Sequence, residues 1–149
     1  MARYGTANPG PTPAIYAPAN DVTLTAGSEV LAITTTSALV GIPGLSYIPV
    51  ILGLACITMG GTASSALTLA ARYSGGSDFA TQVIPAGVLV NSAVLTLAVC
   101  LVGASVDAAA DGTIGGAAIE ITGHTVTQAA TWTKIGTQLT ILLLPGGQA

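Results

Sequence analysis

Charged side chains are scarce in this sequence. Asp, Glu, Lys and Arg make up 6% of its 149 residues, as six acids and three bases with a net charge of −3, whereas about a quarter of an ordinary globular domain is charged. Three cations are too few for the basic patch that a phosphate backbone needs, which argues against nucleic-acid binding. Because surface charge keeps a monomer dispersed, we expect this surface to be covered by small Thr, Ser, Gly and Ala side chains or by another subunit.

Groups able to carry out catalysis are also few. His124 is the only histidine, and a general base needs a nucleophile or a proton donor within reach. Cys56 and Cys100 lie in apolar runs rather than in the electropositive surroundings that stabilise a thiolate. The Gly-x-Ser-x-Gly elbow, the His-Glu-x-x-His motif and the phosphate-binding glycine loop are all absent. We therefore expect no enzymatic activity, no catalytic residue and no cofactor.

A single acidic cluster, Asp107 and Asp111 followed by Gly112, is the one candidate for a metal site. Calcium takes six to eight oxygen ligands, and this spacing does not match an EF-hand loop. We interpret the two carboxylates as solvated loop charge and predict no metal site.

The two cysteines fit buried, unbridged hydrophobic positions. A disulfide between Cys56 and Cys100 stays open, since spacing alone cannot show that their strands face each other. The first twenty residues contain no apolar segment of the secretory type, so we expect synthesis and assembly in a reducing cytoplasm.

Two long stretches, 30–71 and 79–106, contain no Lys or Arg and no acid. Each is long enough to hold a membrane span of about 20 residues. Prolines and glycines interrupt both stretches, and no cluster of Lys or Arg at their ends would set an orientation. A small two-span membrane protein is the less favoured alternative.

The apolar pattern has a period of two over most of the chain, which is typical of β-strands. No segment carries a sustained helical stripe, and only a short piece such as 105–110 could be helical. Gly53 within an apolar run indicates a bulge or a close backbone approach, residues 104–116 read as a loop, and Gly123-His124 reads as a turn. We predict about eight strands in an all-β, antiparallel, jelly-roll-like β-sandwich, at about residues 22–25, 29–40, 47–59, 67–73, 79–83, 94–101, 117–122 and 137–144.

Residues 1–20 form a separate segment with prolines at positions 9, 11, 13 and 18. Proline disfavours helix and central strand, so we predict an extended arm at 1–20 and one domain at 21–149. The arm is either an unanchored terminus or a strap across a neighbouring subunit, with Tyr4, Ile15 and Tyr16 as its interface anchors.

Two further side-chain groups have more than one interpretation. Trp132 is a candidate interface residue, because aromatic residues anchor interfaces, or else a core residue whose indole N–H bonds to the backbone. Arg72 and Glu120 fall on the polar side of alternating strands and could pair across a sheet or across an interface.

The apolar segments of the chain are Leu45–Met59, Ala66–Tyr73, Ser92–Gly103, Ile119–Thr122 and the run from Leu139 to Pro145. In its composition and in the pattern of these segments, the chain is similar to small virion proteins. It resembles the jelly-roll subunits of bacteriophage capsids, in particular decoration or cement proteins. The resemblance implies a homo-oligomer that binds a shell of major capsid protein and stabilises it, located on the capsid surface. A main coat or tail-fibre subunit and a receptor- or glycan-binding module remain as alternatives, and no residue role is carried over.

Overall fold

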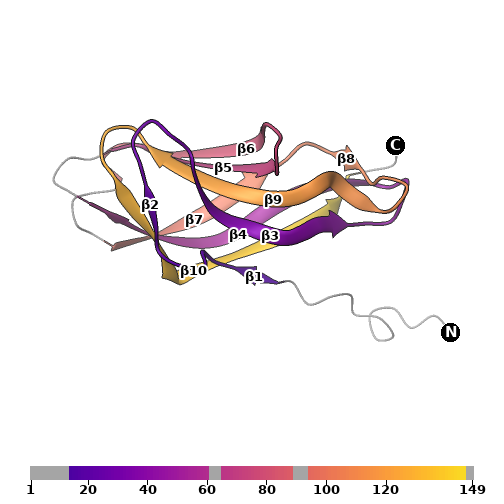
Figure 1. Ribbon diagram of the computed structural model, residues 1–149, viewed down its shortest axis with the longest axis horizontal. Coiled ribbons are helices and arrows are strands. Elements are labelled where there is room, and N and C mark those ends of the chain that lie inside the picture. The colour runs from indigo at the N-terminus through magenta and orange to yellow at the C-terminus, as the bar shows by residue number, and fades with distance from the viewer. Residues whose placement is uncertain (1–13, 61–64, 89–93, 147–149) are drawn as a thin grey trace.

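All regular secondary structure in the described residues is β-strand (Figure 1). The computed structural model describes residues 14–60, 65–88 and 94–146. The predicted all-β class is confirmed, although the described chain has ten strands rather than about eight. They are β1 (Ile15–Tyr16), β2 (Val22–Leu24), β3 (Val30–Val40), β4 (Ser46–Met59), β5 (Leu67–Tyr73), β6 (Asp78–Ile84), β7 (Val94–Val102), β8 (Val106–Asp107), β9 (Thr113–Thr125) and β10 (Ala130–Pro145).

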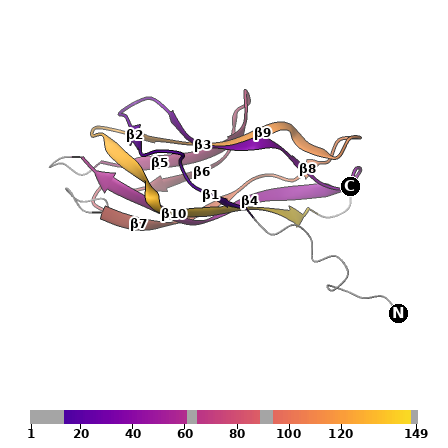
Figure 2. The same ribbon diagram turned by 60° about the horizontal axis from the view of Figure 1, so that its bottom comes forward.

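The strands form two antiparallel sheets that lie face to face (Figure 2). Sheet A has the order β1-β10-β4-β7, with β2 also paired to β10 and β8 paired to β4. Sheet B has the order β3-β9-β5-β6. If β1 and β2 are counted as one interrupted edge strand and the two-residue β8 is set aside, eight strands remain. Their distribution over two four-stranded sheets is that of a jelly roll, which confirms the predicted sandwich.

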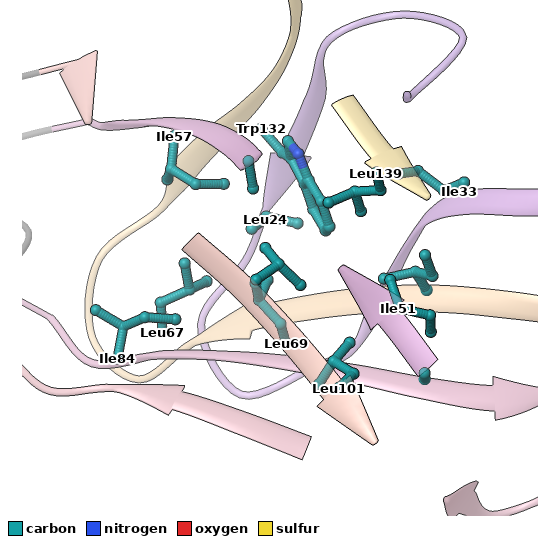
Figure 3. Close-up of a cluster of buried hydrophobic side chains, with 14 of the residues drawn as sticks. Leu24, Ile33, Ile51, Ile57, Leu67, Leu69, Ile84, Leu101, Trp132 and Leu139 are labelled. Carbon is teal, nitrogen blue, oxygen red and sulfur yellow. The ribbon is translucent and has the colours of Figure 1, made fainter. Parts of the chain in front are cut away.

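The core fills the space between the sheets with aliphatic side chains from both (Figure 3). Alternation along each strand sends every second side chain inward, and the inward residues of this chain are mostly Leu, Ile and Val. Full burial of each such side chain stabilises the fold by about 1.5–3 kcal/mol. The largest fully buried residues are Trp132, Leu24, Ile51, Ile57, Met59, Leu67, Leu69, Leu101, Ile114, Ile119 and Ile121.

Several predicted boundaries are wrong in the C-terminal third. The predicted turn at Gly123-His124 lies inside β9, and Gly123 pairs with Val30 on one side and Leu69 on the other. A Cβ on Gly123 would lie 3.0 Å from a methyl carbon of Leu24, so this glycine makes room for a core side chain and does not end a strand. The predicted loop at 104–116 contains β8 and the start of β9, and no helix forms at 105–110.

Gly53, in the middle of β4, is the close backbone approach that the sequence indicated. Its φ is +147°, and a Cβ there would overlap the carbonyl oxygen of Gln138 on β10. The β4–β10 register shifts between Thr133 and Gln138, just beside this contact. Only glycine fits both the backbone conformation and the space.

The predicted division into an arm and a domain falls between residues 20 and 21, whereas β1 lies before that point. Its two residues pair with β10 of the same chain, because an edge strand tolerates the prolines that flank it. The remainder of the predicted arm, residues 1–13, lies outside the described residues.

Candidate interaction surface

The outward side of sheet A is an apolar surface built by β4, β7 and β10. Directly paired residues of an antiparallel ladder share one face, and the buried Ile51, Leu101 and Leu139 mark the inward one. The opposite positions are therefore outward. We call them the sheet A face: Ile48, Val50, Leu52, Leu54, Cys56 and Thr58 of β4, Val94, Thr96, Ala98, Cys100 and Val102 of β7, and Thr131, Thr133, Gln138, Thr140, Leu142 and Leu144 of β10.

Large apolar side chains on the sheet A face remain exposed. Leu54 is 46% exposed and Val102 is 54% exposed, with Leu52, Val94 and Leu144 also open to solvent. Both the odd-numbered and the even-numbered residues of β4 are apolar, a pattern typical of a strand covered on both sides. The inward side is covered by sheet B. The outward side is apolar and only partly covered within the described residues, because Val50 and Cys56 are buried there whereas Leu52 and Leu54 are exposed.

No position of the sheet A face holds Asp, Glu, Lys, Arg or His. The outward side of sheet B is different, because Arg72 of β5 lies between two carboxylates there. Its Nε donates to Glu120 of β9 and its Nη1 donates to Glu29, each at 2.8 Å. The predicted pairing of Arg72 with Glu120 therefore occurs across a sheet. The charged groups mark the solvated side of the sandwich, and the uncharged side is the candidate for contact with a partner.

Glu120 is held in its ionised form by two donors. The Arg72 guanidinium, and then the Ser74 hydroxyl at 2.9 Å, donate to its carboxylate and lower its pKa below the ordinary value. A hydrogen bond to the charged form favours that form. Since this network lies near the surface, its contribution to stability is below about 1 kcal/mol.

Part of the outer edge of β7 is covered by a side chain from the other sheet. The Gln82 amide nitrogen donates to the Ala98 carbonyl at 2.9 Å, and the Cys100 N–H donates to the Gln82 amide oxygen at 3.0 Å. Gln82 thus satisfies two backbone groups that an edge strand would otherwise present to another strand.

Trp132 does not contribute to the surface. Its side chain is completely buried between the sheets (Figure 3), so the surface alternative is wrong and the core alternative is the one observed. Its indole N–H donates to the Thr137 hydroxyl at 3.1 Å rather than to the backbone group that the sequence analysis expected. The position of the β10 irregularity, which brings Thr137 back beside Trp132, has no clear signal in the sequence.

The three predicted arm anchors have different positions. Ile15 is 68% exposed and pairs with Thr140, which places it on the same outward side as the sheet A face. Tyr16 pairs with Leu139 and packs against the core cluster. Both residues are therefore attached to β10 of their own chain. Tyr4 lies outside the described residues.

The two cysteines are not bridged, and their surroundings differ. Cys56 is buried, whereas Cys100 is exposed. The prediction of two buried cysteines is therefore right for Cys56 and wrong for Cys100, because no described element covers the outward side of β7 at that position. Cys100 pairs with Leu52 on the sheet A face and reports on whether that face is open.

The other candidate groups are separate from one another. His124 pairs with Thr68 on sheet B, and its buried Nδ1 has no hydrogen-bond partner. Asp111 accepts hydrogen bonds from the Thr113 N–H and then its hydroxyl, which lower the pKa of the carboxyl. Asp107 accepts a hydrogen bond from Ser46. Within residues 14–60, 65–88 and 94–146, no three His, Cys, Asp or Glu side chains come close enough to share a metal ion.

The described part of the chain also contains no helix that is long and apolar enough to span a membrane. No protein-family model matches the sequence, and no curated protein is significantly similar to it.

Proposed function

We propose that this protein is a non-enzymatic structural subunit of a virus particle, of the capsid-decoration type, that acts by self-association through the sheet A face. The observation that carries the proposal is the apolar, charge-free face on one side of a jelly roll whose other side holds the ion-paired residues. Contiguous exposed apolar surface of this kind marks interaction sites in soluble proteins. Jelly rolls recur in viral shells, and the apolar, charge-poor segments resemble those of phage shell subunits. A shell of major capsid protein is then the second partner, and the capsid surface is the location.

The occupant that we propose for the sheet A face is a second copy of the same chain. The face offers no charge for an oppositely charged partner to bind, whereas an apolar face matches its own copy in a two-fold, isologous contact. The face is built by β4, β10 and β7, which have 14, 16 and 9 residues. At about 3.3 Å per residue along a strand and about 4.8 Å between neighbouring strands, these lengths give a face area of about 600 Å² per copy. Two copies would bury about 1,200 Å², the lower limit for a stable specific interface.

The experiment compares Leu54→Glu on the sheet A face with Val83→Glu on sheet B. Val83 is 61% exposed and pairs with Thr68 on the outward side of β6, so both variants place one acid at an exposed apolar strand position. About half of the Leu54 surface is still exposed in the single chain. Its burial in the interface would stabilise the pair by about 1 kcal/mol for each copy. A symmetric pair should therefore bind at least about 30-fold more weakly in Leu54→Glu, while Val83→Glu should leave association unchanged.

Light scattering after size exclusion, over a range of protein concentrations, measures the association. Circular dichroism checks that both variants keep a β spectrum. Alkylation gives a second readout, because Cys100 should react slowly in the wild-type oligomer and rapidly in Leu54→Glu, while Cys56 stays unreactive in both. A wild-type protein that is monomeric at every concentration would refute self-association. An oligomer that Leu54→Glu leaves intact would refute this face as its interface.

A further inference from the structure

A bulge of β10 lies on the outward side of sheet A. The β4–β10 register is interrupted between Thr133 and Gln138, and the residues between them leave the ladder. A Cβ on Gly136 would lie 3.2 Å from the Cβ of Cys56 and 3.4 Å from its Sγ. Because the Cys56 side chain points outward, Gly136 lies over it on the solvent side. This contact explains why Cys56 is only 8% exposed although it belongs to the sheet A face.

Ile135 is the exposed apolar residue of this bulge. At 85% it is the most exposed large apolar side chain in the part of the chain that the structure describes. Two hydrogen bonds hold the backbone around it: the Lys134 N–H donates to the Asp21 carboxylate at 2.8 Å, and the Thr137 hydroxyl donates to the Thr133 carbonyl at 2.7 Å. Ile135 is therefore an apolar knob on a fixed backbone, and a preorganised group loses little conformational freedom on binding.

The opposite strand of the sheet A face, β7, presents small side chains at the same level. Its outward positions are larger at both ends and smaller in the middle: Val94, Thr96, Ala98, Cys100 and Val102. Thr96 pairs with Cys56 and Ala98 pairs with Leu54. The same two β4 residues pair with Thr133 and Gln138, on either side of the bulge. The knob and the small β7 positions therefore lie on opposite sides of β4, at the same position along it.

A two-fold axis in the plane of contact and parallel to β4 would bring these two features together. A half-turn about this axis exchanges the β10 side with the β7 side and keeps the position along the strands. Ile135 of one copy would then lie over Thr96 and Ala98 of the other, and Leu54 would face its counterpart. An axis across the strands would instead set each bulge against β10 of the second copy, which carries the same bulge. Sheets that pack face to face lie about 10 Å apart, which leaves no room for two opposed bulges.

We propose that two copies pack through the sheet A face about a two-fold axis parallel to β4, with Ile135 of each copy inserted over Thr96 and Ala98 of the other. The inference rests on the proposed self-association through this face, and it adds the orientation of the two copies and the residue that anchors the contact. It is carried by the fit of an exposed apolar knob to a row of small side chains, because the core of a specific interface is packed as closely as a protein interior.

The test is disulfide cross-linking of the full-length protein with Ile135→Cys and Ala98→Cys. The background carries Cys56→Ala and Cys100→Ser, because both native cysteines lie on the same face. Within one chain the two new positions are separated by β4, so they are about 10 Å apart at about 4.8 Å per strand, which exceeds the Cα separation of about 7 Å that a disulfide can bridge. With oxidised glutathione as the oxidant, the double variant should form covalent dimers on a non-reducing gel. Each single variant should form none, since its thiol does not face its own counterpart.

A second measurement keeps both native cysteines and therefore decides the question if the cysteine-free background does not associate. Ile135→Ala should weaken association at least about 30-fold, as measured by light scattering over a range of concentrations, because each of the two copies loses buried carbon atoms. Ile42→Ala is the matched control. Ile42 is 63% exposed and lies in the turn between β3 and β4, so the same change there should leave association unaltered.

The outcomes separate this arrangement from the proposed function. A wild-type protein that stays monomeric would overturn both. An oligomer that Leu54→Glu disrupts but Ile135→Ala leaves intact would overturn only the arrangement. Cross-linking of the single Ile135→Cys variant would place β10 against β10, and cross-linking of the single Ala98→Cys variant would place β7 against β7, so either result would also overturn it. Covalent dimers of the double variant alone, together with weaker association of Ile135→Ala, are the expected outcome.

Discussion

Replacement of Thr137 by valine should destabilise the protein far more than its loss of one oxygen atom suggests. The Thr137 hydroxyl accepts hydrogen bonds from the Cys56 N–H at 3.0 Å and from the Trp132 indole N–H at 3.1 Å, and it donates to the Thr133 carbonyl at 2.7 Å. Thr137 itself is 3% exposed. Valine keeps the shape of the side chain but leaves two buried donors without an acceptor. At about 1–3 kcal/mol for each unpaired group, the free energy of unfolding should fall by about 3 kcal/mol.

Urea unfolding followed by tryptophan fluorescence measures this effect directly, because Trp132 is the only tryptophan and is itself one of the two donors. At a fixed protein concentration the same loss should lower Tm by about 10 °C for a chain of this size. Thr81→Val is the matched control: Thr81 is an exposed strand residue on β6, and its replacement should change stability by less than about 0.5 kcal/mol.

Thr137→Ser separates the hydroxyl from the methyl group. Serine keeps the acceptor for both donors and loses only one methyl, so it should cost about 1 kcal/mol and be clearly more stable than Thr137→Val. If serine proves as harmful as valine, or if valine costs less than about 0.5 kcal/mol, the hydroxyl does not organise this part of the core and the reasoning is refuted.

Two more predictions concern the backbone and the pH response. Gly53→Ala should lower the free energy of unfolding by more than about 3 kcal/mol, since a Cβ there meets the β10 backbone. Gly44→Ala, at φ +80° in open space, should cost only about 1–2 kcal/mol, and equal losses in urea unfolding would contradict this account of Gly53. For Glu120, a lowered pKa means that its stabilisation is present above the ordinary value of 4.5 and is lost as the pH falls through the lower folded value. Stability measured from pH 6 to pH 3 should therefore decline less in Glu120→Gln than in wild type, and parallel curves would show that this carboxylate does not contribute.

The fold could be predicted from the sequence because its main signal is local. The alternation of apolar and polar residues along Leu67–Tyr73 and the continuous apolar run in Val94–Val102 are both local patterns, and both strands lie where these patterns indicate. The boundaries of β9 and β10 depend instead on distant contacts. Glycine is a typical turn residue, so the sequence predicts a turn at Gly123. Its place within β9 depends instead on close packing against the side chain of Leu24, about a hundred residues earlier in the sequence.

The candidate surface could be predicted only in part, for a related reason. In β4 both the odd-numbered and the even-numbered residues are apolar. This pattern indicates that both sides of the strand are covered, but it does not indicate what covers each side. The structure assigns one side to sheet B and leaves Leu52 and Leu54 on the other. The exposure of Cys100 follows from the same assignment, which no pattern within β7 reveals.

The few charged residues of the chain are distributed unevenly over the two sheets. Arg72 and its two carboxylate partners lie on the sheet B side, while Asp107 and Asp111 lie near the β8 turn. The outward positions of β4, β7 and β10 thus carry no charge, and Asp107 of β8, paired with Ser46, lies beside the end of this face. Uncontrolled association of such a surface would lead to open-ended aggregates if the sheet edges were also available. Gln82 covers part of the β7 edge, which limits edge-to-edge pairing there and favours association through the sheet A face.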